Sequence, residues 1–133
     1  MSSYTDVTAD NVEQMKAAVA KQPTSVSIEA DKFVFQMYAT GIFDSAKCGT
    51  ELDHATLVVG YGKQPVTGTE YWIMKNSWGD TWGIGGYMKL AIQEGDGVCG
   101  IQKEPLYPAS TQWDFQQHEL NNTSIKLIDI SII

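Results

Sequence analysis

Residues 52–62 read LDHATLVVGYG, an apolar stretch with one histidine, His54, near its start. Its content of Val, Leu and Tyr predicts a buried β-strand. A second apolar stretch, EYWIMKN at 70–76, follows a loop that contains Gly and Pro, and this order predicts a hairpin. In a hairpin the two strand ends farthest from the loop lie side by side. We therefore expect His54 and Asn76 to be close in space.

The flanking sequence predicts further strands beside this hairpin. Residues 85–92, GGYMKLAI, form a third strand after a glycine-rich turn. Residues 104–108, EPLYP, are expected at an edge, because proline cannot donate to a central ladder. Upstream, residues 25–30, SVSIEA, alternate apolar and polar side chains as a half-buried strand does.

One amphipathic helix is expected over residues 8–22, where apolar residues recur at helical spacing. Asp10 and Glu13 are placed to form a capping box, and Pro23 ends the helix. Residues 31–43 are rich in aromatics and predict a turn or a short helix. Short strands with one early helix indicate an α+β fold, with an antiparallel barrel or an open sheet.

Composition narrows the possible functions. The 133 residues carry a net charge of −7 and are 43% hydrophobic, which is typical of a globular domain. The negative charge argues against nucleic acid and anionic membranes as partners. No apolar run is long enough to span a membrane, and the first twenty residues show no signal peptide.

The last part of the chain differs from the rest. Residues 110–122 are polar and are interpreted as a linker, and residues 124–133 form an apolar tail rich in β-branched residues. Asn121 and Asn122 begin two overlapping glycosylation sequons. We therefore separate a domain at 1–109 from a linker and tail at 110–133.

The chemistry of the chain depends on its histidine and its cysteines. Taken alone, His54 is explained equally well as a core histidine or as a functional one. An Asn76 side-chain carbonyl that accepts a ring N–H would fix the orientation of the imidazole and favour a functional role. Trp78 and Trp82 are either core aromatics or a cover that keeps water from this pair. The two cysteines are a disulfide, two buried thiols or a source of one nucleophile. No metal site is expected from so few ligands.

Several segments together resemble a known family. They are QPTSVSIEA, GIFDSAKCG, LDHATLVVGYG, YWIMKNSWGDTWGIGGYMKL and GVCGI, in this order. They are similar to the C-terminal half of papain-like (cathepsin L-type) cysteine proteases over roughly residues 5–109. That half is the right-hand, β-barrel domain, which forms one wall of the active-site cleft.

The resemblance implies roles for individual residues. His54 would be the catalytic histidine and Asn76 would orient it. Trp78 would shield that pair, Trp82 would line the primed side of the cleft, and Asp53 would support the site. No cofactor is implied.

The resemblance also implies a disulfide and a substrate pocket. Cys48 and Cys99 match the family's right-domain disulfide. Glu104 matches the floor of the S2 pocket, where it would accept a basic P2 side chain. The same pocket would be lined by Ser27, Leu52 and Ala55.

This sequence departs from the family pattern in one respect. The family's C-G-[SA]-C-[WY] nucleophile segment and its oxyanion glutamine are absent from these residues. We therefore expect the chain alone to be inactive and to need the missing N-terminal domain as its partner before it cleaves peptide or protein substrates. The alternative is a non-catalytic binding or regulatory module, or a truncated gene product; an intermediate case is a two-chain enzyme whose halves stay associated after proteolysis. Self-association through the face that would meet the missing domain is a further hypothesis. The parent enzyme would be lysosomal, vacuolar or secreted.

Overall fold

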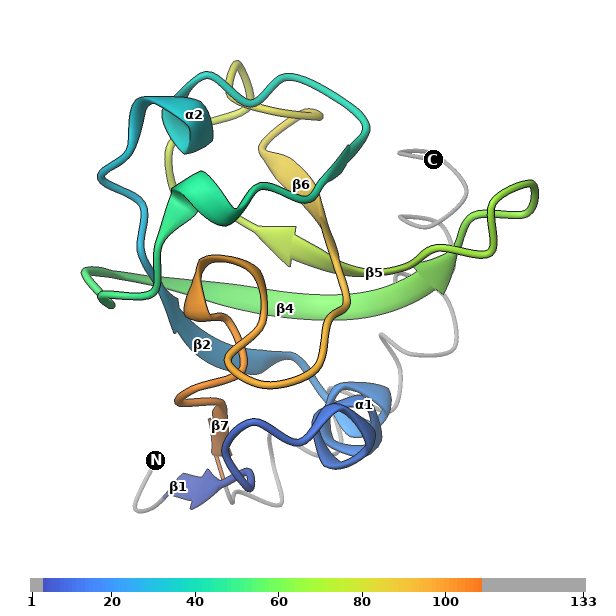
Figure 1. Ribbon diagram of the computed structural model, residues 1–133. Helices are drawn as coiled ribbons and strands as arrows, with labels where there is room; N and C mark the ends of the chain where they lie inside the picture. The colour runs from blue at the N-terminus through green and yellow to red at the C-terminus, as the bar shows by residue number, and fades with distance from the viewer. Residues whose placement is uncertain (1–3, 109–133) are drawn as a thin grey trace.

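The structure is a computed structural model, and it describes residues 4–108. Seven strands form a single sheet in the order β1-β7-β2-β4-β5-β6-β3, with the long strand β4 running through its middle (Figure 1). The strands are β1 (Tyr4–Asp6), β2 (Thr24–Ile28), β3 (Ile42–Phe43), β4 (His54–Lys63), β5 (Glu70–Lys75), β6 (Tyr87–Ala91) and β7 (Leu106–Pro108).

The predicted hairpin is present as β4 and β5. The strands pair antiparallel from Leu57–Lys75 to Lys63–Glu70, with an irregularity between Val58 and Gly60. Glycine is needed at position 62, since a Cβ there would lie 2.7 Å from the hydroxyl of Tyr71 on the facing strand. β6 pairs antiparallel with β5 and β2 pairs antiparallel with β4, so the predicted central strands are confirmed.

The sheet is curved like a barrel but remains open. Its two edges are β1 and β3, which are not neighbours in the strand order. All pairs are antiparallel except β3 with β6, which is parallel. The fold is therefore α+β and barrel-like, as expected, with one parallel pair at an edge. The sequence did not predict the short edge strand β1. Because β1 pairs with β7, residues 106–108 do not lie at the edge expected for them.

The N-terminal helix is shorter than predicted and has a different cap. Helix α1 spans Val12–Lys21, and Asn11 is its N-cap, with the side chain accepting a hydrogen bond from the backbone N–H of Gln14. Asp10 was the wrong choice: its backbone N–H donates to the Gln102 carbonyl at 2.7 Å, and its φ of 56° lies outside the helix. The tertiary contact to residue 102 thus moves the N-cap from residue 10 to residue 11.

The core lies between the curved sheet, α1 and the loops that carry the short helices. One face of α1 is buried, through Val12, Met15, Ala18 and Val19. At the centre, Trp72 is fully buried and its indole N–H donates to the side-chain oxygen of Gln102 at 3.3 Å. This bond satisfies the polar atom of the largest core side chain, as buried indoles require.

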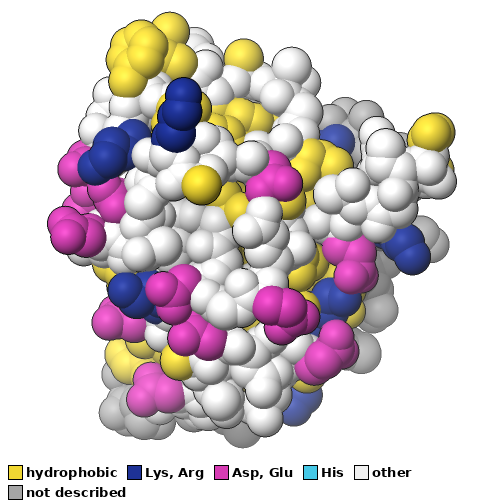
Figure 2. Space-filling view, viewed as in Figure 1, with side chains coloured by type: hydrophobic (Ala, Val, Ile, Leu, Met, Phe, Trp, Pro, Cys, Tyr) yellow, Lys and Arg dark blue, Asp and Glu magenta, His cyan; other side chains and the backbone are white. Residues whose placement is uncertain are grey.

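The segment 31–43 contains the short helix α2 (Phe33–Gln36), in agreement with the predicted turn or short helix. Phe35 points into the core, whereas Phe33 and Met37 are exposed. Figure 2 shows a group of hydrophobic side chains at the top of the molecule over α2, while acidic and basic side chains are interspersed over the rest of this face. No helix within residues 4–108 is long and apolar enough to cross a membrane. The linker, tail and sequons predicted in 110–133 lie outside the described residues.

Candidate active site

His54 opens strand β4, and its neighbour Asp53 fixes the point where the strand begins. His54 is the register partner of Ile28 at the end of β2. The Asp53 backbone N–H donates to the Ile28 carbonyl at 2.9 Å, and the Asp53 carboxylate accepts from the Ala30 N–H at 2.8 Å. The backbone N–H and the carboxylate of Asp53 thus both bind at one end of β2. These two bonds fix the backbone just before His54 and so help to orient its side chain.

Asn76 follows β5 and is buried beside His54. The distance from His54 Nε2 to Asn76 Oδ1 is 2.9 Å. The same oxygen accepts from the backbone N–H of Ser77 at 2.7 Å. A backbone N–H only donates, so the amide atom that faces it is the oxygen and not the nitrogen.

This orientation of the amide fixes the histidine tautomer. A carbonyl oxygen only accepts, so His54 Nε2 must carry the proton of this hydrogen bond. In the neutral ring the basic lone pair is then on Nδ1. Nδ1 is therefore available as a base, while Nε2 is hydrogen-bonded to Asn76 Oδ1.

Trp78 covers this pair. Its ring lies 5.2 Å from the His54 ring, centroid to centroid, at an interplanar angle of 32°. Trp78 meets Phe35 and Trp82 edge-on, at 5.6 Å and 5.4 Å, and is 38% exposed. It therefore forms the outer layer of an aromatic cluster, with one face toward the histidine.

Trp82 is an inner member of the same cluster. It is buried, lies 5.3 Å from Phe35 and 5.6 Å from Tyr38, and donates its indole N–H to the Gln36 carbonyl at 3.1 Å. These contacts join the turn after β5 to helix α2. The ring contact with His54 is made by Trp78.

The four residues expected in the S2 pocket are arranged across three neighbouring strands or their extensions. Ser27 and Ala55 are register partners in β2 and β4. Ser25 pairs with Leu106, and Glu104 comes two residues before β7, in the direction in which antiparallel β2 runs on to Ser27. Leu52 lies against Gly100, where an added Cβ would come within 2.9 Å of its side chain.

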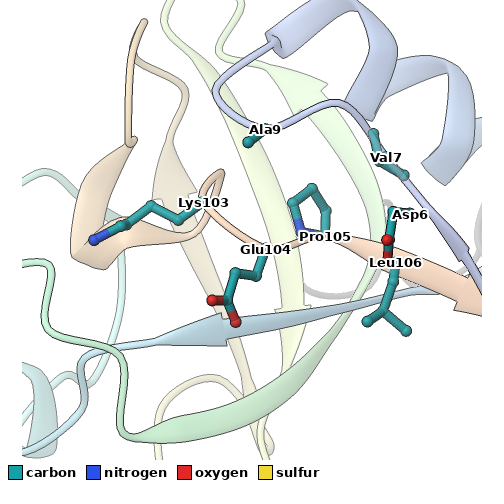
Figure 3. A pocket seen from close by; sticks show the side chains of 7 residues that line it. All are labelled: Asp6, Val7, Ala9, Lys103, Glu104, Pro105 and Leu106. Carbon is teal, nitrogen blue, oxygen red and sulfur yellow. The ribbon is translucent and has the colours of Figure 1, made fainter.

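A cavity of about 360 Å³ lies next to Glu104. Figure 3 shows the side chains that line it, and in that view Glu104 and Pro105 leave the chain on opposite sides. The lining residues are Asp6, Val7, Ala9, Lys103, Glu104, Pro105 and Leu106. None of the other three predicted S2 residues lines this cavity, so it lies between Glu104 and the N-terminal segment and does not include His54.

Cys48 and Cys99 form a disulfide, with their Cα atoms 5.1 Å apart. It joins two 3₁₀ turns, Ala46–Cys48 and Val98–Gly100, and both cysteines are buried. The sequence holds two cysteines in all, so neither sulfur is a free thiol in this structure. Among residues 4–108, no group of three or more His, Cys, Asp or Glu side chains is placed to hold a metal ion.

Glu29 is a contributor that the sequence did not reveal. It is buried, accepts from the backbone N–H of Glu51 at 2.8 Å and pairs with Lys32 at 2.5 Å. The Lys32 ammonium and the Glu51 N–H lower the pKa of this carboxyl to about 2. Through its bond to the Glu51 N–H, Glu29 stabilises the loop between Cys48 and His54. Its one sequence signal was Lys32, three residues later.

Comparison with known proteins identifies the family of the chain. Residues 1–109 match the family described as papain family cysteine protease. Cysteine proteinase RD21A of Arabidopsis thaliana is 49% identical over 110 residues, which are 81% of this chain and 23% of that protein. Thiol protease SEN102 of Hemerocallis is 48% identical over 113 residues, 84% of this chain and 31% of that protein.

A solved structure gives the same result. The bromelain protease from Ananas comosus, solved in complex with the E64 inhibitor, matches with a TM-score of 0.74 and 43% identity, over 79% of this chain and 48% of that chain. The chain thus spans about a quarter to a third of the curated relatives and about half of the solved one. We conclude that the chain belongs to the papain family of cysteine proteases and covers the C-terminal portion of the family's domain.

Proposed function

We propose that the chain is the right-hand half of a papain-like cysteine endopeptidase and supplies the histidine and asparagine of its active site. The observation that carries this proposal is the 2.9 Å contact between His54 Nε2 and Asn76 Oδ1. It leaves Nδ1 as the ring nitrogen that can take a proton from a thiol. The ring and the thiolate then form the ion pair that a cysteine protease needs.

The reaction would proceed by acyl transfer. The thiolate attacks the scissile carbonyl, and the His54 imidazolium gives its proton to the leaving amine, which leaves a thioester. A water then attacks the thioester, with His54 taking the water's proton and the sulfur leaving as thiolate. Asn76 would hold the ring in orientation throughout, and Trp78 would keep water away from their hydrogen bond.

The nucleophile would come from outside these 133 residues, because both sulfurs of the chain are in the disulfide. We propose that an N-terminal domain carries the thiol and the oxyanion donor and packs against the face that carries His54 and Trp78. The chain alone is then inactive. A non-catalytic binding module would use the same face, and the partly exposed indole of Trp78 is compatible with either use.

The substrates would be peptides or proteins, with a preference at P2 set by Glu104. Its side chain is exposed, and it comes two residues before β7, which pairs with the strand that carries Ser27. A carboxylate there would bind a basic P2 side chain by a charge-assisted hydrogen bond. The disulfide is consistent with an oxidising compartment such as a secretory or vacuolar one.

The test is a chimera in which residues 1–109 replace the matching segment of the Arabidopsis relative. We expect this protein to hydrolyse a fluorogenic peptide with Arg at P2, and a thiol-alkylating agent to abolish the activity. His54→Ala should lower kcat by at least about a thousandfold, since it removes the acid and base together. His118→Ala, at the only other histidine of the chain, is the matched control when made in a chimera that also retains the tail.

The outcomes separate the two proposals. A folded chimera that keeps its activity without His54 would refute the catalytic assignment. A folded chimera that is inactive but binds peptides would favour the binding module. Glu104→Gln should reduce the preference for Arg over Leu at P2 by about tenfold, and an unchanged preference would refute the role of Glu104 alone.

A further inference from the structure

The amide of Asn76 is only half satisfied by the described residues. Its oxygen accepts two hydrogen bonds, whereas its nitrogen, Nδ2, is buried with no partner among residues 4–108. One other buried side-chain atom in that part of the chain is in the same condition, the hydroxyl of Thr56. Buried polar groups nearly always have a partner, so two such atoms in one domain call for an explanation.

The sheet places these two residues opposite one another. Leu57 pairs with Lys75 and Val58 with Met74, and one further step of the same register sets Thr56 against Asn76. Both side chains are buried, at 8% and 1% exposure, on the face that also carries His54. Opposite residues on one face have Cβ atoms about 4.5–5.5 Å apart. The hydroxyl and the amide nitrogen make no direct hydrogen bond with each other, so one bridging water is the shortest link between them.

We propose that Thr56 is a positioning residue for Asn76, with its hydroxyl joined to Asn76 Nδ2 through a single buried water. The water would accept from Nδ2 and donate to the Thr56 oxygen, which gives it polar partners on both strands. Rotation of the amide about its last bond would break this link. The link therefore keeps Oδ1 directed at His54 Nε2, and Thr56 acts on the histidine without touching it.

Only the catalytic consequence of this inference rests on the proposed function; the link itself does not. It is tested by ¹⁵N NMR of the full 133-residue chain, in which the ring nitrogens report the ratio of the Nε2–H to the Nδ1–H tautomer of neutral His54. Thr56→Val keeps the shape and removes the hydroxyl. We expect it to lower that ratio by about tenfold, which corresponds to about 1.4 kcal/mol, and to shift the Asn76 side-chain amide signal.

Two variants separate positioning from a general effect of the substitution. Thr56→Ser keeps the hydroxyl and should restore the ratio to near the original value. Thr24→Val removes a different buried hydroxyl, one that bonds the Gln22 carbonyl, and should leave the ratio unchanged. An unchanged ratio in Thr56→Val, or an equal change in Thr24→Val, would overturn the inference.

A measurement on the unmodified chain covers the case in which Thr56→Val does not fold. The buried water should give cross-relaxation with the Asn76 side-chain amide protons and with the Thr56 hydroxyl proton. Absence of both signals would overturn the inference. If Thr56→Val changes the tautomer ratio of His54 but the chimera is inactive, the proposed function fails and the Thr56–Asn76 link stands. If the chimera needs His54 for activity but Thr56→Val leaves the tautomer ratio unchanged, only this inference fails.

Discussion

Reduction of the Cys48–Cys99 disulfide should remove a large share of the domain's stability. The two residues are 51 positions apart, and the segment between them contains β4, β5 and β6. For a closed loop of that length, the chain-entropy relation gives about 14 cal/mol/K, or about 4 kcal/mol at 25 °C. Typical domains are stable by about 5–15 kcal/mol, so the loss is a major fraction of the total.

The assay is equilibrium unfolding in urea, followed by tryptophan fluorescence, with and without reductant. With a slope of about 1.3 kcal/mol/M, typical of a domain of this size, the midpoint should fall by about 3 M. The melting temperature should fall by about 15 °C. The reduced chain keeps both sulfur atoms, so its packing changes little and the shift reports the loss of the cross-link.

A pair of variants checks this reasoning. Cys48→Ala breaks the cross-link and empties part of one buried site, and the double variant with Cys99→Ala differs from it only by a second small cavity. The two should therefore lie within about 1 kcal/mol of one another. A reduced chain whose free energy of unfolding stays within about 1 kcal/mol of the oxidised value would refute the loop-closure argument.

Three other predictions concern stability. Gly49→Ala should lower the free energy of urea unfolding by about 2–3 kcal/mol, because φ is +81° and the added Cβ would lie 2.2 Å from the Glu29 carboxylate. Gly41→Ala is the control, with φ of +85° and open space around the added Cβ, and should cost only about 1 kcal/mol. A larger cost at Gly41 than at Gly49 would contradict the steric argument. Lys32 and the Glu51 N–H hold the pKa of Glu29 near 2, below its ordinary value of 4.5. The stability that Glu29 contributes is therefore present above about pH 4.5 and is lost as the pH falls toward 2. Over this window the urea midpoint of Glu29→Gln should fall less than that of the original chain, and parallel profiles would contradict the assignment. Ile28→Ala should cost about 2–5 kcal/mol, because the side chain is fully buried, and a cost below about 1 kcal/mol would show that the β2 end does not hold the core.

The central hairpin was predictable because local patterns decide it. The apolar runs at 57–62 and 70–76 each fill a strand, and their connecting loop is too short for any other pairing than antiparallel. Pairing then brings His54 to Asn76 with no further information. The part of the site that depends on this hairpin was therefore accessible from the sequence.

The features that were missed depend on contacts between distant segments. Strand β1 is three residues long and exists through its pairing with β7. The parallel pair of β3 and β6 likewise joins segments about 47 residues apart, and no local pattern encodes it. Asp10 and Asn11 are both good N-cap residues, and the choice between them was made by the bond from residue 10 to Gln102.

The pairing of β1 with β7 has a consequence for engineering. Tyr4 and Pro108 are direct register partners, and Figure 1 shows the N-terminal strand beside β7. The two ends of the described part of the chain therefore lie next to each other, as in domains that tolerate insertion into another protein. A short linker between residues 4 and 108, with new ends opened at the exposed turn around Val66, would give a circular permutant whose sheet keeps every strand pair.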